Sequence, residues 1–210
     1  MIDEKPTVFI VDDDPSACRG LSRLIQAAGM SVQSYSSAQD FLGQADDNSH
    51  GCIVLDVKMP GLNGLDLQAE LQQKNIALPI VFVSGHSEIS DTAVAMKRGA
   101  IDFLTKPVDR DHLLKAVAEA LEKDRENRKV LTERARIHEK LSALTPREYT
   151  ILEFVITGML NKQIAYALDI SEDTVKVHRG RVMKKMSAGS LAELVRFADQ
   201  AGIKPAEVDD

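Results

Sequence analysis

Five residues in the first half of the chain are of types that together suit phosphate chemistry. They are three aspartates, Asp12, Asp13 and Asp56, with Ser84 and Lys106. Carboxylate oxygens are the ligands that Mg²⁺ prefers in proteins. A hydroxyl donor and an ammonium group facing a metal-bound carboxylate suit phosphoryl transfer. The residue types therefore predict a phosphoryl-transfer site, provided that the fold brings the five side chains together.

The elements that position these residues alternate between strand and helix. Nearly continuous β-branched or aromatic runs predict buried parallel strands, with strong candidates at 8–11, 53–55 and 80–83 and weaker ones at 32–35 and 102–104. Helical patterns fill the intervals at 15–28, 37–44, 64–74, 89–98 and from 109 onward. Five such units in order predict a doubly wound, open parallel sheet of flavodoxin-like type.

Each of the five residues directly follows, or stands at the end of, one of these strands. The carboxyl ends of parallel strands share one edge of the sheet, where ligands bind. Three carboxylates gathered there would repel one another unless a cation joined them, so the pattern predicts Mg²⁺. Taken alone, an aspartate at a strand end is usually a helix cap, and Asp14, followed by Pro15, is assigned that role.

Charge divides the chain into two modules. The formal net charge of the whole chain is −6, but residues 1–120 carry −7 and residues 121–210 carry +1. From residue 113 to about residue 144 the chain has no Gly or Pro and dense charge, which predicts a last helix running into a solvated, helical linker. Leu131 and Ile137 in this stretch could pack on either module or on a partner chain.

The second module is helical throughout. Thr145, Pro146 and Glu148 form a capping-box pattern at the start of one helix. Asn161 is expected to cap a short helix and Ser171 the next, which is basic. A short helix, a tight turn and a basic helix make a helix-turn-helix signature, and a final helix is expected from residue 190 to about residue 201.

The first half resembles the receiver domain of bacterial response regulators. The motifs are Val11-Asp12-Asp13-Asp14, the run from Leu55 to Gly61, Ser84-Gly85-His86 and Lys106-Pro107. The resemblance implies that Asp56 accepts a phosphoryl group from the phosphohistidine of a sensor kinase. It implies that Mg²⁺ is held by Asp13, Asp56 and the main-chain carbonyl of Lys58, with Asp12 acting through water. It also implies that Lys106 pairs with the phosphoryl oxygens, that Ser84 hydrogen-bonds them, and that Phe103 then changes rotamer.

Lys58 and His86 each lie two residues beyond a site residue. Their side chains could overhang the pocket and tune how fast water removes the phosphoryl group. His86 is expected to be an exposed loop histidine rather than a catalytic one.

The second half resembles the LuxR-type helix-turn-helix, and the whole chain resembles the FixJ/NarL class of response regulators, with the C-terminal half nearest to the FixJ branch. The motifs run through 144–148, 161–165 and 170–179. We therefore expect a receiver at 1–121, a helical linker at 122–142 and an all-α, four-helix DNA-binding domain at 143–204.

The helical wheel of the basic helix separates buried from exposed positions. Val175, Val182 and Met186 define the buried stripe, and five residues fall on the far side: Lys176, Val177, Gly180, Arg181 and Lys184. Arg179 falls about 40° from Val175, so we expect it to be partly structural, paired with Glu148 or Glu153.

The family resemblance implies that Lys176, Val177 and the position of Gly180 face the major groove of DNA. Because glycine has no side chain, base readout is expected from Lys176, Val177 and Arg181, with Gly180 permitting close approach of the backbone. Lys162 and Lys184 are expected to contact phosphates, which positions the protein without reading sequence.

These features predict a cytoplasmic transcription regulator of a two-component system, and no enzyme. Expected partners are a sensor histidine kinase, promoter DNA and RNA polymerase, with homodimerisation on phosphorylation through 89–98 and the strand around Phe103, and no membrane. By family habit, activation is expected over repression. The alternatives are a phosphorylation-independent DNA-binding protein with a vestigial receiver and a metal-dependent phosphatase. A flavodoxin-like nucleotide or flavin binder lacks a glycine-rich loop after the first strand.

Overall fold

The computed structural model describes residues 5–46, 49–85 and 89–207. The chain divides into two compact units, Met1–Arg128 and Lys129–Asp210. One helix, α5, contributes residues to both units, so each unit is described by itself. The domain limits expected from the sequence, at residues 121, 142 and 204, stay predictions.

The first unit is built on a five-stranded parallel sheet. Its strand order is β2-β1-β3-β4-β5, and the register pairs Val11 with both Tyr35 and Leu55. The strands are β1 (Thr7–Val11), β2 (Ser31–Tyr35), β3 (Gly51–Asp56), β4 (Ile80–Ser84) and β5 (Asp102–Thr105). Every residue of β3 and β4 is buried, as expected of strands covered on both faces. The predicted doubly wound sheet is confirmed.

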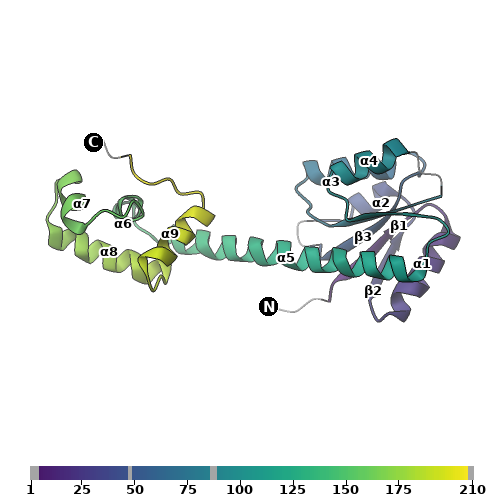
Figure 1. Cartoon of the computed structure of the whole chain (residues 1–210), viewed down its shortest axis with the longest axis horizontal. Coiled ribbons are helices and arrows are strands. Elements are labelled where there is room, and N and C mark those ends of the chain that lie inside the picture. The colour runs from purple at the N-terminus through teal and green to yellow at the C-terminus, as the bar shows by residue number, and fades with distance from the viewer. Residues whose placement is uncertain (1–4, 47–48, 86–88, 208–210) are drawn as a thin grey trace. The chain divides into compact units, whose positions relative to one another are not determined.

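Two layers of helices cover this sheet, α2, α3 and α4 on one face and α1 and α5 on the other (Figure 1). These helices are α1 (Pro15–Ala27), α2 (Ala38–Leu42), α3 (Gly64–Gln73), α4 (Ile89–Lys97) and α5 (Arg110–Ser142). Asp14 caps α1 as predicted, because its side chain accepts the N–H of Ser16 at 2.8 Å. Phe41 and Leu67 fill one core, and Ile25 and Leu113 the other.

Helix α5 is continuous over 33 residues, which confirms a last helix running on into a helical linker. The expectation that its second half is solvated is wrong at Asp124, and Ile137 packs on one of the two modules, one of the arrangements that the sequence allowed. Asp124 is 3% exposed and belongs to the first unit, whereas Ile137 is fully buried in the core of the second. Val130 and Leu131, between them, are more than half exposed.

The second unit consists of the end of α5 followed by α6 (Pro146–Val155), α7 (Asn161–Ala167), α8 (Glu172–Met186) and α9 (Leu191–Gln200). Its core is formed by side chains from all five helices, among them Ile137, Leu152, Ile164, Val182 and Leu194. The Thr145–Glu148 capping box and the Ser171 cap are present as predicted.

The predicted cap at Asn161 is wrong. Leu160 is the N-cap residue of α7, and its main-chain N–H donates to the side chain of Gln163 at 2.8 Å. Asn161 is the first helical residue, and its side chain accepts a hydrogen bond from Arg179 instead. Within the described ranges, the helices are all too short or too polar to cross a membrane.

Candidate functional site

The first candidate site lies at the carboxyl edge of the parallel sheet. The ammonium group of Lys106, just beyond β5, lies 2.7 Å from Oδ2 of Asp12 and 2.8 Å from Oδ1 of Asp56. Asp12 follows β1 and Asp56 ends β3, so two neighbouring strands and β5 bring the three side chains together. Both carboxylates are almost fully buried, whereas Lys106 is 27% exposed. A partly exposed cation therefore bridges two buried carboxylates at the edge of the sheet.

Burial and charge act in opposite directions on Asp56. Burial penalises its carboxylate and raises the pKa of Asp56 above the ordinary aspartate value, an effect that the hydrogen bond and charge of Lys106 partly offset. Burial also works against the charge of Lys106, but the two carboxylates outweigh it and raise the pKa of Lys106. The ammonium group is thus kept protonated beside the Asp56 carboxyl.

The loop after β3 holds Asp56 through its backbone. The main-chain N–H of Lys58 donates to Oδ2 of Asp56 at 2.8 Å, and the N–H of Gly64 donates to the carbonyl of Val57 at 2.9 Å. A Cβ atom at Gly64 would lie 2.2 Å from the main-chain oxygen of Asp56, so this close approach requires glycine. The requirement for glycine at position 64 was not predicted from the sequence, although the Asn63-Gly64 pair is a common turn signal.

The three predicted carboxylates do not form a ready-made metal cage. Asp13 is exposed, Asp12 is buried against Lys106, and the described part of the chain contains no group of three His, Cys, Asp or Glu residues that could hold a metal ion. The available donors nevertheless fit Mg²⁺. They are hard carboxylate oxygens at one sheet edge, few in number, and Mg²⁺ keeps several waters of its own.

The two predicted switch residues lie on adjacent strands. Ser84 ends β4, is 1% exposed, and its carbonyl accepts the main-chain N–H of Lys106 at 2.8 Å. Phe103 on β5 is half-buried and stacks on Phe82, with ring centroids 5.8 Å apart. The side chain of Lys58 is exposed, and His86 lies outside the described residues.

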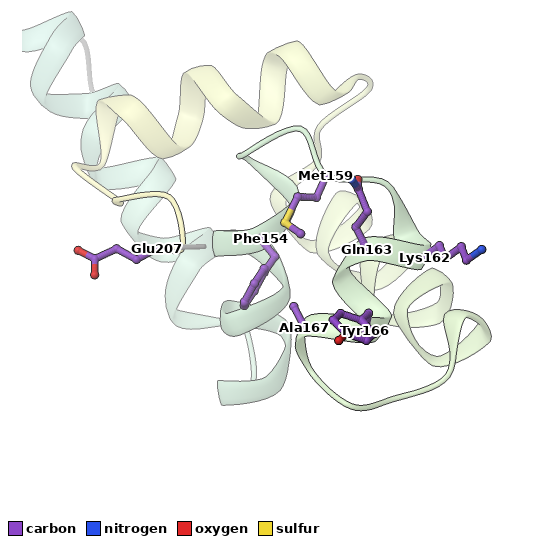
Figure 2. Close-up of a pocket in the computed structure, with 7 residues that line it drawn as sticks. All are labelled: Phe154, Met159, Lys162, Gln163, Tyr166, Ala167 and Glu207. Carbon is purple, nitrogen blue, oxygen red and sulfur yellow. The ribbon is translucent and has the colours of Figure 1, made fainter. Parts of the chain in front are cut away.

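The second candidate site is the exposed face of α8. Val175, Val182 and Met186 are fully buried, which confirms the predicted stripe. On the opposite face five residues are exposed: Lys176, Val177, Gly180, Arg181 and Lys184. Lys162 on α7 is also exposed, and its ammonium group points away from the neighbouring Gln163 and Tyr166 (Figure 2). Short helix α7, the turn at Asp169 with its positive φ, and α8 form a helix-turn-helix.

The predicted partner of Arg179 is wrong. Arg179 is half-buried, as its place on the wheel requires, but its guanidinium donates to Oδ1 of Asn161 at 2.9 Å. The carboxylate of Glu148 instead forms an ion pair with Lys185, whose ammonium lies 2.6 Å away. It also accepts a hydrogen bond from the main-chain N–H of Thr145. Lys185 is the partner of Glu148 because a second hydrogen bond, to the main-chain carbonyl of Ala143, holds its ammonium group there. The two contacts join the start of α6 to the end of α8.

Comparison with known proteins finds one family model for each half of the chain. Residues 8–118 match the family model of the response regulator receiver domain, and residues 142–198 match that of the bacterial regulatory proteins of the luxR family. The chain belongs to the response regulators.

Relatives of this response regulator share both domains along nearly their whole length. It is 45% identical to nodulation protein W of Bradyrhizobium diazoefficiens over 199 residues, 95% of this chain and 88% of that protein. It is 39% identical to the transcriptional regulatory protein FixJ of Azorhizobium caulinodans over 204 residues, 97% of each. Among solved structures, the response regulator StyR matches with 43% identity and a TM-score of 0.84, covering 93% of this chain and 99% of that one. The predicted FixJ-like class is therefore confirmed.

The two matches enclose both candidate sites of the response regulator. The receiver match contains the cluster of Asp12, Asp56 and Lys106, and the luxR-family match contains the exposed face of α8. This response regulator is thus a transcriptional regulator with a LuxR-type DNA-binding domain, and its family is not one of classical enzymes.

Proposed function

We propose that Asp56 is the phosphoryl acceptor and that a sensor histidine kinase is the donor. An oxygen of the Asp56 carboxylate attacks phosphorus, the P–N bond of the kinase phosphohistidine breaks, and the imidazole leaves with the electron pair of that bond. The observation that supports this proposal is the Lys106 ammonium between Asp12 and Asp56. Because this ammonium group contacts the Asp56 carboxylate, it compensates the negative charge of a phosphoryl group transferred to Asp56.

Mg²⁺ would be held by Asp13, Asp56 and the main-chain carbonyl of Lys58, with Asp12 acting through water. When bound, it neutralises charge on the phosphoryl oxygens. The N–H of Lys58 holds one oxygen of Asp56 and leaves the other facing Lys106. Ser84 then hydrogen-bonds the phosphoryl group, and Phe103 changes rotamer.

In the second unit, Lys176, Val177 and Arg181 read bases in the major groove, and Gly180 lets the helix backbone approach. Lys162 and Lys184 contact phosphates. All six positions are exposed on α7 or α8, which supports this assignment. Phosphorylation promotes dimerisation of the receiver and hence binding to paired half-sites of promoter DNA in the cytoplasm, where RNA polymerase is recruited and transcription activated.

The test is the intact mass of the full chain after incubation with acetyl phosphate and Mg²⁺. Wild type is expected to gain one phosphoryl group and Asp56→Asn none. Asp111→Asn, at an exposed position of α5, serves as the matched control and should gain the group as wild type does. No gain in folded wild type with Mg²⁺ present, or equal gain in Asp56→Asn, would overturn Asp56 as the acceptor and favour the vestigial-receiver alternative.

A further inference from the structure

The guanidinium of Arg179 is a half-buried cation whose bonded partner is neutral. It donates to the amide oxygen of Asn161 at 2.9 Å, and within the described ranges it forms no ion pair with a carboxylate. Two other half-buried cations, Lys106 and Lys185, each have a carboxylate within 2.8 Å, and a third, Lys140, lies over the ring of Phe197. Burying part of a charge without an opposite charge is unfavourable, so the position of Arg179 points to an anionic ligand.

The place of Arg179 on α8 indicates which anion. On the helical wheel Arg179 lies between the buried Val175, about 40° away, and the exposed Lys176, about 60° away on the other side. It therefore borders the face that is expected to meet DNA, on the edge that is turned toward α7 by the bond to Asn161. Asn161 directly precedes Lys162, an exposed cation.

The chemistry of the pair fits a phosphate. A guanidinium carries five N–H donors in a rigid fork, and Asn161 Oδ1 engages one of its terminal nitrogens and fixes its direction. The Asn161 amide has two further donors of its own. An arginine held in this way pays less conformational entropy when it binds a phosphate oxygen than a freely rotating one.

We propose that Arg179 and Asn161 together form a clamp for a phosphate of the DNA backbone, at the junction of α7 and α8. Arg179 supplies the charge, and Asn161 is a positioning residue that holds the guanidinium at the junction. The inference rests on the proposed DNA face of α8 and adds to it a contact that carries no base information. The clamp determines how deeply α8 enters the major groove of DNA.

A backbone contact is independent of sequence, so the promoter need not be known. The probe is labelled duplex DNA of mixed sequence, titrated with the full chain by fluorescence anisotropy over a series of salt concentrations. For Arg179→Gln we expect about tenfold weaker binding and a salt slope lower by about 0.9, the value for one lost phosphate contact. Arg179→Lys retains the charge and should keep the wild-type slope. Both variants should keep the wild-type melting temperature.

Two further variants separate the clamp from general charge effects. Arg147→Gln removes an exposed charge on α6 and should leave affinity and slope unchanged. Asn161→Asp keeps the shape and the bond to Arg179 but pairs the guanidinium with a carboxylate, which offsets its charge toward a phosphate. It should keep the melting temperature and weaken binding more than Gln163→Glu, which adds the same charge two residues away.

The outcomes distinguish failure of the clamp from failure of the DNA face. If wild type binds and Arg179→Gln binds equally well with the same slope, the clamp is overturned and the DNA face stands. If Arg179→Gln loses affinity only together with its melting temperature, and its slope is unchanged, Arg179 is merely structural. If wild type and all variants fail to bind duplex DNA, both the proposed DNA-binding face of α8 and the proposed clamp are contradicted.

Discussion

The role of each half-buried cation in this response regulator depends on the side chain that it contacts. Lys106, Lys185 and Arg179 are all half-buried cations, yet their surroundings differ. Lys106 bridges two carboxylates at the sheet edge, Lys185 closes one helix onto another through Glu148, and Arg179 meets an amide. The first arrangement suits a transferred anion, the second a structural lock, and the third a ligand phosphate.

Glu148 should make the stability of the second unit depend on pH. The ammonium of Lys185 and the N–H of Thr145 lower the pKa of Glu148 from 4.5 to about 2. Between these values the unfolded chain binds more protons than the folded one, so the stabilisation is complete above about pH 4.5 and is lost as the pH falls toward 2. Glu148→Gln should cost about 1–3 kcal/mol at neutral pH and flatten this dependence.

The measurement for Glu148 is thermal unfolding followed by circular dichroism across that pH range. Glu139→Gln, at an exposed position of α5, is the control and should retain the wild-type profile. A profile for Glu148→Gln that falls as steeply as that of wild type would contradict the assignment.

Glycine at position 180 should lower the stability of α8 and favour DNA binding. A Cβ atom at this position would meet nothing within 4 Å, so packing inside the chain does not require glycine. Gly180→Ala should therefore stabilise α8 by up to about 1 kcal/mol. If the backbone approaches DNA closely here, the added methyl group should weaken binding at the same time. Thermal unfolding and anisotropy titration with duplex DNA measure the two effects. A variant that is more stable and binds DNA as well as wild type would contradict a close approach of the α8 backbone to DNA.

At the scale of elements, the linker half of α5 is tied down at its start. Oδ2 of Asp124 accepts the N–H of Gly51 at 3.1 Å and contacts Nδ1 of His50. Arg128 lies 3.6 Å from the same carboxylate oxygen and donates to the carbonyl of Ser49 at 2.7 Å. These contacts attach α5 to the entry of β3 as far as Arg128, beyond the expected end of the receiver at residue 121.

Asp124→Ala should destabilise the first unit by about 1–3 kcal/mol, because the buried N–H of Gly51 loses its acceptor. Hydrogen exchange of the α5 and β3 amides is the appropriate measurement, since the loss is local to these two elements. Glu126→Ala, on the exposed side of the same turn, should change stability by less than about 0.5 kcal/mol. Equal protection in Asp124→Ala and wild type would show that the contacts contribute nothing.

At the scale of the whole molecule, phosphorylation should change the association state. Helix α4 exposes three large apolar side chains, Ile89 at 91%, Val94 at 37% and Met96 at 43%. Ile89 and Met96 lie about 20° apart on the helical wheel, so these two side chains suit a partner surface, and a second copy of the receiver is the proposed partner. In sedimentation velocity, wild type treated with acetyl phosphate and Mg²⁺ should sediment as a dimer and Asp56→Asn as a monomer. Phosphorylated wild type that remains monomeric would contradict receiver dimerisation.

The architecture could be predicted from the sequence because it depends on periodicity and on caps. Runs of β-branched residues identified the strands, and Pro15, Thr145 and Ser171 identified helix starts, since these signals act within a few residues. The same patterns placed Asp12, Asp56 and Lys106 at strand ends. Parallel strands carry their carboxyl ends to one edge, so the meeting of these residues followed from topology.

Tertiary structure alone decided which side chains pair across long stretches of the chain. Arg179 pairs with Asn161 and not with Glu148. Asp124, in the part of α5 that was expected to be solvated, is a buried hydrogen-bond acceptor. Glycine is required at position 64 because the residue lies close to the main chain of Asp56. Periodicity gives the direction of a side chain around its own helix but not the identity of what faces it across 18 or 73 residues of chain. Those partners are selected by packing geometry and by the cost of leaving buried polar groups unpaired, which act only once the elements have assembled.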